Sequence, residues 1–214
     1  MAYVFITNDS GHRTIIYERS CLPPIETGKE ITDLFERASV LLLDPQVTYF
    51  APRLKTFDRL PLIIYDCEHL REGMEDMMET ADFFIPSSEF LNSAGISIEG
   101  LSLTDKMRSL HRMISGTLVM TLGDQGACYI HEDRVHQVLP PRTEIVDTTG
   151  AGDNFHAAFS LAISRGFTLK DSVRFSVAVA TLSCRAYGGR EGVPDFDEAY
   201  RVMQGLEERV LSGS

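Results

Sequence analysis

Short apolar runs alternate with amphipathic stretches along the middle of the chain, at lengths typical of strands and helices. The clearest apolar run, residues 40–44, has few polar interruptions, as in a strand covered on both faces. Strands are predicted at residues 40–44, 61–66, 82–85 and 117–122, and helices at residues 27–38, 49–59, 70–79 and 104–114. Because strand and helix alternate, we expect a mostly parallel, doubly wound α/β sheet with helices on both faces.

The two ends of the chain depart from this alternation. Two β-rich stretches, residues 2–8 and 13–18, flank the turn Asp9-Ser10-Gly11-His12 and predict a hairpin. The residues Thr27-Gly28-Lys29-Glu30 have capping-box spacing, which predicts a helix that opens at Thr27. A second hairpin is predicted at residues 127–130 and 135–138, and further helices at residues 151–164, 169–186 and 195–210. We therefore expect a lid-like hairpin and connector over residues 1–26, and one α/β core over residues 27–214.

Composition narrows the possible partners. The chain has 20 lysines and arginines against 31 aspartates and glutamates, a formal net charge of −11. Such a surface repels phosphate backbones and anionic lipids, so we expect no nucleic-acid or membrane partner. No apolar run approaches the ~18 residues of a membrane span, and the N-terminus reads as a strand, not a signal peptide. Cys21, Cys67, Cys128 and Cys184 lack metal or redox spacing and fit a reducing compartment, which predicts a cytoplasmic protein.

The strongest candidate for chemistry is a glycine-rich turn between a short predicted strand and a helix. Ile145 and Val146 form the predicted strand, and Asp147-Thr148-Thr149-Gly150-Ala151-Gly152-Asp153 leads from it into the helix. Glycines let the main chain approach a ligand closely, and the first N–H groups of a helix point outward. Together with the helix dipole, they predict an anion site at Gly150, Ala151 and Gly152.

Asp153 stands where it would repel an anion held by that turn. Taken alone, a carboxylate in the first turn of a helix is simply a favourable partner for the helix dipole. Beside glycines that leave room for an anion, it makes better sense as a general base that takes a proton from a hydroxyl attacking phosphorus. The surrounding N–H groups would then stabilise charge on the transferring phosphoryl group, so these residues predict a phosphotransferase.

Competing motif classes do not fit the sequence. Position 155 is phenylalanine, so Gly150-Ala151-Gly152 does not complete the dinucleotide fingerprint of a Rossmann-type oxidoreductase. Gly28-Lys29 is followed by Glu30, so this segment is not a Walker-type phosphate loop. His131 and His136 are one residue too far apart to share a helical zinc face, and a turn between hairpin strands is the simpler interpretation. The serines lack the G-x-S-x-G elbow of hydrolases.

Several segments, in their order along the chain, resemble the pfkB (ribokinase-like) family of carbohydrate kinases. Residues 147–153 resemble the second signature of this family, and residues 119–126 (Val-Met-Thr-Leu-Gly-Asp-Gln-Gly) resemble its nucleotide loop. Residues 11–15 (Gly-His-Arg-Thr-Ile) resemble a hairpin of ketohexokinase-like members, and residues 180–194 resemble the helix and loop beside the adenine. The resemblance implies a ribokinase-like fold, and ATP-dependent phosphorylation of a sugar or sugar-like hydroxyl.

The resemblance also implies roles for individual residues. Asp153 would be the catalytic base, and Gly150, Ala151 and Gly152 would form the anion hole. Arg13 would lie near the ATP phosphates, with a solvated hairpin charge as the alternative interpretation. The residues implied to line the nucleotide site, unless they simply turn the chain after a strand, are Gly123, Asp124, Gln125 and Gly126.

Metal sites are implied in the same way. Asp147 and Thr149 occupy positions where many members bind a monovalent cation such as K⁺, and helix capping is the equally simple alternative. The family's Mg²⁺-positioning N-x-x-E stretch reads Pro86-Ser87-Ser88-Glu89 here, without the asparagine. Glu89 would therefore act on Mg²⁺ directly or through water, or else serve only as a first-turn helix acid.

One departure from the family pattern bears on activity. Members of the family begin with further strands, a sugar-binding aspartate and a Gly-Gly-Asn region, so this chain resembles the C-terminal two thirds of a sugar kinase. A non-catalytic, nucleotide-binding regulatory protein is therefore the alternative to an active kinase. An uncovered sheet edge around residues 40–43 and 62–65 predicts a homodimer or a marginally stable chain, with weak sugar binding.

Overall fold

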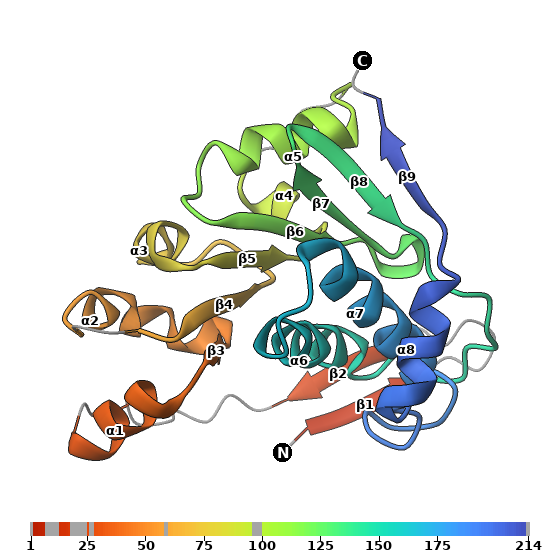
Figure 1. Ribbon diagram of the computed structural model, residues 1–214, viewed down its shortest axis with the longest axis horizontal. Helices are drawn as coiled ribbons and strands as arrows, with labels where there is room; N and C mark the ends of the chain where they lie inside the picture. The colour runs from red at the N-terminus through yellow and green to blue at the C-terminus, as the bar shows by residue number, and fades with distance from the viewer. Residues whose placement is uncertain are drawn as a thin grey trace.

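The computed structural model describes residues 2–6, 13–17, 25, 28–57, 60–95 and 100–212. Within these residues the main feature is a seven-stranded sheet of order β3-β4-β5-β6-β7-β8-β9 (Figure 1). Its strands are β3 (Val40–Leu43), β4 (Leu62–Cys67), β5 (Phe83–Pro86), β6 (Thr117–Thr121), β7 (Ala127–His131), β8 (Arg134–Val138) and β9 (Glu208–Leu211). Neighbouring strands are parallel from β3 to β6 and antiparallel from β6 to β9. The α/β class expected from the alternation is confirmed.

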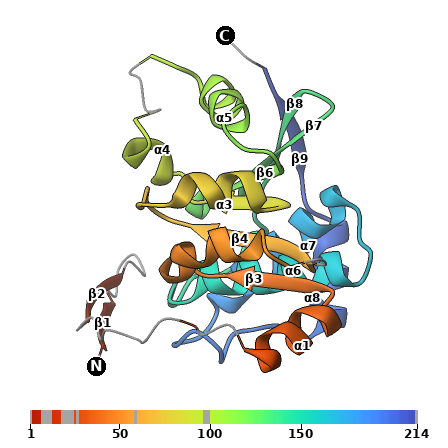
Figure 2. The same ribbon diagram turned by 90° about the vertical axis from the view of Figure 1, so that its left-hand side faces the viewer.

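Helices cover both faces of this sheet (Figures 1 and 2). One face carries α1 (Lys29–Arg37), α2 (Ala51–Leu54), α3 (Met74–Thr80), α4 (Phe90–Ser93) and α5 (Leu103–His111), and the other carries α6 (Ala151–Ser164), α7 (Leu169–Ser183) and α8 (Phe196–Gln204). Strand β4 shows why two cores form. Ile63 and Tyr65 point into the first core and Ile64 into the second, because successive side chains of a strand face opposite sides.

A separate two-stranded sheet contains β1 (Ala2–Ile6) and β2 (Arg13–Tyr17), which pair antiparallel. The predicted N-terminal hairpin is therefore confirmed as a pair of strands, and Figure 2 shows it standing apart from the larger sheet. The turn Asp9-Ser10-Gly11-His12 lies outside the described residues. The division into a hairpin unit and a core at residue 27 stays a prediction.

The structure corrects the predicted starts of two helices. Helix α1 begins at Lys29 with Gly28 as its N-cap, so it starts later than the expected start at Thr27. Thr27, the expected cap, lies outside the described residues. The helix expected at residues 49–59 is a 3₁₀ segment, η1 (Pro45–Phe50), that runs into the short α2. This helical segment starts earlier than expected because Asp44 caps it. The Asp44 side chain accepts a hydrogen bond from the backbone N–H of Gln46.

The C-terminal helix expected at residues 195–210 is also too long. Helix α8 ends at Gln204, and residues 208–211 form β9 against β8. Glu208 fixes this strand, because its carboxylate accepts a hydrogen bond from the Tyr129 hydroxyl at 2.7 Å and contacts Nδ1 of His136 at 3.0 Å. These contacts come from distant parts of the chain, which a local pattern does not report.

Two further expectations concern the cysteines and the membrane. Cys67, Cys128 and Cys184 are buried, and Cys21 lies outside the described residues. Across the described ranges, no helix combines the length and apolar character needed to cross a bilayer.

Candidate active site

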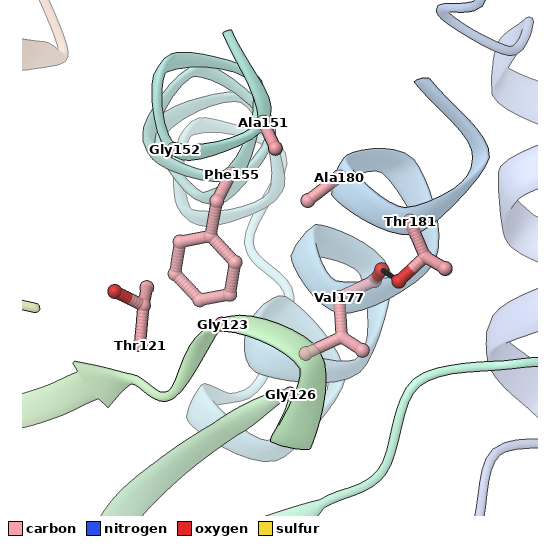
Figure 3. Close-up of a pocket in the computed structure, with 9 residues that line it drawn as sticks. All are labelled: Thr121, Gly123, Gly126, Ala151, Gly152, Phe155, Val177, Ala180 and Thr181. Carbon is pink, nitrogen blue, oxygen red and sulfur yellow. Dashed lines mark hydrogen bonds between the residues drawn. The ribbon is translucent and has the colours of Figure 1, made fainter. Parts of the chain in front are cut away.

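A cavity opens at the edge of the sheet where β6 ends. Its volume is about 120 Å³, and Figure 3 shows residues from three segments around it. The turn after β6 lies on one side, and α6 and α7 lie on the other. Its lining residues are Thr121, Gly123, Gly126, Ala151, Gly152, Phe155, Val177, Ala180 and Thr181. The two glycine-containing segments that the sequence singled out, after β6 and before α6, therefore meet at one cavity.

The start of α6 presents main-chain atoms to this cavity. Gly150 is the N-cap with φ of 73°, a left-handed conformation that glycine adopts readily. Among the described residues, none accepts a hydrogen bond from the backbone N–H of Gly152 or Asp153. A Cβ built on Gly152 meets nothing within 4 Å. The turn thus combines free N–H donors, the positive end of a helix and open space.

The carboxylate of Asp147 holds this turn through hydrogen bonds with backbone N–H groups. Asp147 is 1% exposed, and its two oxygens accept hydrogen bonds from the backbone N–H groups of Thr149 and Gly188, both at 2.8 Å. Val146 and Asp147 themselves donate backbone hydrogen bonds to the carbonyl of Cys184. The short strand expected at Ile145 and Val146 is not formed, and the backbone N–H of Val146 donates to Cys184 at the end of α7 instead of to a neighbouring strand.

The turn after β6 closes tightly. Gly126 has φ of 81°, and a Cβ there would lie 2.1 Å from the carbonyl oxygen of Val138. The Gln137 side chain donates a hydrogen bond to the carbonyl of Gln125 at 2.9 Å and holds the turn against β8. Glycine is therefore required at position 126 for the fold itself, whatever the ligand.

The predicted residues differ in how they lie relative to the cavity. Gly123, Gly126, Ala151 and Gly152 line it, whereas Asp124 and Gln125 are exposed and do not. Asp153 is exposed in the first turn of α6.

Two further predicted residues, Glu89 and Arg13, are not among the described residues that line the cavity. Glu89 is the exposed N-cap of α4, beside Ser88, whose backbone N–H donates to the carbonyl of Thr121 at 2.9 Å. Glu89 therefore follows the strand next to β6. Arg13 opens β2, opposite Ile6, and its side chain lies outside the described part.

Sequence reasoning missed the apolar wall of the cavity. Val177, Ala180 and Thr181 lie on successive turns of α7, and the Thr181 hydroxyl donates to the Val177 carbonyl at 2.8 Å (Figure 3). The resemblance of residues 180–194 to the adenine-side helix was the available signal for two of them. Sequence reasoning also missed the contact between Asp66 on β4 and His156 on α6.

A glycine turn that opens a helix at the carboxyl edge of an α/β sheet defines a class of phosphate- and nucleotide-binding proteins. The sequence places the chain within that class. The model of the pfkB family carbohydrate kinases matches residues 46–195, and the chain belongs to that family.

Individual relatives agree with this assignment. The ribokinase of Lactococcus lactis is 27% identical over 146 residues, which is 68% of this chain and 46% of that protein. The nucleoside kinase of Methanothermobacter thermautotrophicus is 36% identical over 99 residues, 46% of this chain and 32% of that protein. The chain therefore matches less than half the length of these curated relatives.

Solved structures share the fold. The structure of Arabidopsis thaliana ribokinase complexed with ribose and ATP superposes with a TM-score of 0.71, at 22% identity, over 95% of this chain and 68% of that one. The predicted ribokinase-like architecture is confirmed.

Proposed function

We propose that the protein transfers the γ-phosphoryl group of ATP to a hydroxyl of a sugar or sugar-like substrate. The observation that carries the proposal is the open main-chain turn of Gly150, Ala151 and Gly152 at the start of α6, with Asp153 exposed beside it. Free N–H donors and the helix dipole favour a phosphate there, worth roughly 0.3–1 kcal/mol per charge at an exposed helix end. A carboxylate beside a phosphate needs a chemical reason, and base catalysis supplies one.

The nucleotide would extend from this turn along the cavity. Its adenosine part would lie between Gly123 and Gly126 on one side, and Val177 and Ala180 on the other, where small and apolar side chains leave room for a flat ring. Its phosphates would reach the N–H groups of Gly152 and Asp153. Arabidopsis ribokinase, which has the same fold, is a protein whose structure contains ribose and ATP. Arg13 would lie near the phosphates, and Asp124 and Gln125, between Gly123 and Gly126, would lie beside the nucleotide.

Asp153 would act as general base in one displacement. It takes the proton of the attacking hydroxyl while that oxygen forms a bond to the γ-phosphorus. The bond between the γ-phosphorus and the bridging oxygen breaks, and ADP leaves with the electron pair. The N–H groups of the turn stabilise the charge on the transferring group, and α6 holds donors and base in one fixed relation.

Two metal ions would be bound at this edge of the sheet. The Thr149 hydroxyl oxygen is buried and has no hydrogen-bond partner among the described residues, and with the Asp147 carboxylate it would hold a monovalent cation such as K⁺. The described side chains form no cluster of three metal ligands, so Mg²⁺ would be held mainly by ATP phosphates and water, with Glu89 as the nearby carboxylate. Bound Mg²⁺ would neutralise phosphate charge.

Phosphoryl transfer by the purified chain tests this function. ATP, Mg²⁺ and K⁺ are supplied with ribose, fructose or a nucleoside, and ADP and the product are followed by ³¹P NMR. We expect ADP to form only with an acceptor, together with an equal amount of a phosphate monoester. ATP binding without any transfer to these acceptors would overturn the proposal and favour the nucleotide-binding regulatory protein instead.

A further inference from the structure

His156 lies one turn into α6, buried at 4% exposure, and its ring contacts three acceptors. Nδ1 is 2.7 Å from the carbonyl oxygen of Gly152. Nε2 is 3.1 Å from the carbonyl oxygen of Ile85 and 3.4 Å from the carboxylate oxygen Oδ1 of Asp66. Asp66 and Ile85 lie near the carboxyl ends of β4 and β5, so this ring joins the first turn of α6 to two strands.

The chemistry of these contacts fixes the protons on the ring. A carbonyl oxygen only accepts hydrogen bonds, so each ring nitrogen must donate to make its contact. A neutral imidazole carries one N–H, and a protonated imidazolium carries two. Only the imidazolium satisfies the contacts with Gly152 and Ile85 together, and Asp66 then supplies the opposite charge.

The charged groups around this pair are acidic. The pKa of Asp66 is raised to about 6, by burial most of all and also by the carboxylates of Glu68, Asp153 and Asp44, while His156 acts to lower it. These carboxylates come from β4 and its loop, from α6, and from the end of β3. A cation at His156 would lie beside the Asp66 carboxylate, at 3.4 Å.

We propose that His156 is a doubly protonated positioning residue that ties the Gly152–Asp153 turn of α6 to the ends of β4 and β5 through Gly152, Ile85 and Asp66. The ring holds the carbonyl of Gly152, which belongs to the same planar peptide unit as the backbone N–H of Asp153. It therefore sets the direction of the Asp153 N–H and the position of the Asp153 side chain. The consequence for turnover rests on the proposed phosphoryl transfer, whereas the state of the ring does not.

Nitrogen NMR of the histidine rings tests the protonation state directly. In the ¹⁵N-histidine-labelled chain at pH 8, the His156 signals are assigned by their loss in His156→Gln, and His131, an exposed residue at the end of β7, provides a second ring for comparison. We expect both ring nitrogens of His156 to show a one-bond coupling to hydrogen, and Asp66→Asn to abolish one of them. A single protonated nitrogen in the unmodified chain would overturn the proposal.

Kinetics separate positioning from simple packing. We expect His156→Gln to lower kcat by about ten- to a hundredfold, as expected for a misplaced reacting group, and to change ATP affinity by less than threefold. The matched control is Phe159→Leu, one turn further along α6, which loosens buried packing without touching Gly152 or Asp66. We expect it to lower thermal stability with little effect on kcat. Equal losses of stability and kcat in both variants would reduce His156 to a packing residue. If the unmodified chain transfers no phosphate, the function proposed above fails, and the NMR result still decides the state of His156.

Discussion

The carboxylate of Asp147 accepts a hydrogen bond from the backbone N–H of Gly188 at 2.8 Å, across 41 positions of sequence. Its other oxygen accepts from Thr149. One buried side chain therefore fastens the glycine turn before α6 to the loop after α7. Since this turn leads directly into Ala151 and Gly152, which line the cavity, the hydrogen bonds of Asp147 help to hold the candidate phosphate site.

Replacing Asp147 tests this fastening. We expect Asp147→Ala to lower the free energy of unfolding by about 1–3 kcal/mol, because two partly buried N–H groups lose their acceptor. ATP affinity, measured by calorimetry, should fall with it. Asp147→Asn keeps one acceptor oxygen, so its free energy of unfolding and its ATP affinity should fall less than those of Asp147→Ala. Unchanged ATP affinity in Asp147→Ala would show that the turn keeps its shape without this carboxylate.

A substitution at Gly152 should weaken ligand binding without destabilising the fold. A Cβ at this position meets no protein atom within 4 Å, and the residue is helical. We expect Gly152→Ala to leave the midpoint of urea unfolding unchanged or to raise it, because alanine favours a helix by about 1 kcal/mol over glycine. The added methyl group should nevertheless weaken ATP binding by blocking close approach of phosphate.

The control for that variant is Gly166→Ala, at a left-handed position with open space beyond the end of α6. It should cost stability and leave ATP affinity unchanged. ATP affinity equal to that of the unmodified chain in Gly152→Ala would move the phosphate site away from this turn.

Glu208 should make the stability of the folded chain depend on pH in the acidic range. Burial alone would raise the pKa of Glu208, but hydrogen bonds from Lys170 and Tyr129 outweigh burial and hold that pKa below its usual value. A lowered pKa stabilises the folded chain above the unfolded pKa of the group, and this contribution is lost as pH falls through the folded pKa. We expect the melting temperature of Glu208→Gln to fall less on acidification than that of the unmodified chain.

The matched control is Glu132→Gln, since the Glu132 side chain is 83% exposed on the β7–β8 turn. This variant should keep the acid dependence of the unmodified chain. Identical curves for Glu208→Gln and the unmodified chain would remove Glu208 as a source of acid sensitivity.

The β3 edge of the sheet predicts self-association. Among the described strands β3 has a neighbour on one side only, and Leu42 and Leu62 near it are 40% and 43% exposed. Exposed strand edges with apolar side chains invite pairing with another chain. Light scattering should report a dimer or larger species, and Leu42→Lys should shift it toward the monomer. A monomer at all concentrations would contradict the homodimer expected from the sequence.

The parallel half of the fold could be predicted because its signals are local. The apolar run at residues 40–44 and the helix at residues 151–164 each show their periodicity within one segment, and both appear in the structure near the expected bounds. Strand β9 could not be predicted in this way. Residues 208–211 form a strand because β8 offers them an edge and because Tyr129 and His136 engage Glu208.

The residues of the candidate site also differ in whether their signal in the sequence is local. Residues 147–153 form one continuous segment, so the sequence could mark Gly152 and Asp153. The pair of Asp66 and His156 exists only because β4 and α6 pack together. A buried histidine in an amphipathic helix gives no sign, in sequence, of the acceptors that will surround it.

In the proposed mechanism, Asp153 is the base of a phosphoryl transfer at the start of α6. The decisive experiment measures acceptor-dependent ADP formation and ATP affinity together for the unmodified chain and Asp153→Asn. The amide keeps the shape of the side chain but accepts no proton, so we expect kcat to fall by ~10²–10⁴-fold while the Kd for ATP stays within threefold. Full turnover by Asp153→Asn would contradict the claim and leave Asp153 as an acid that only favours the helix end.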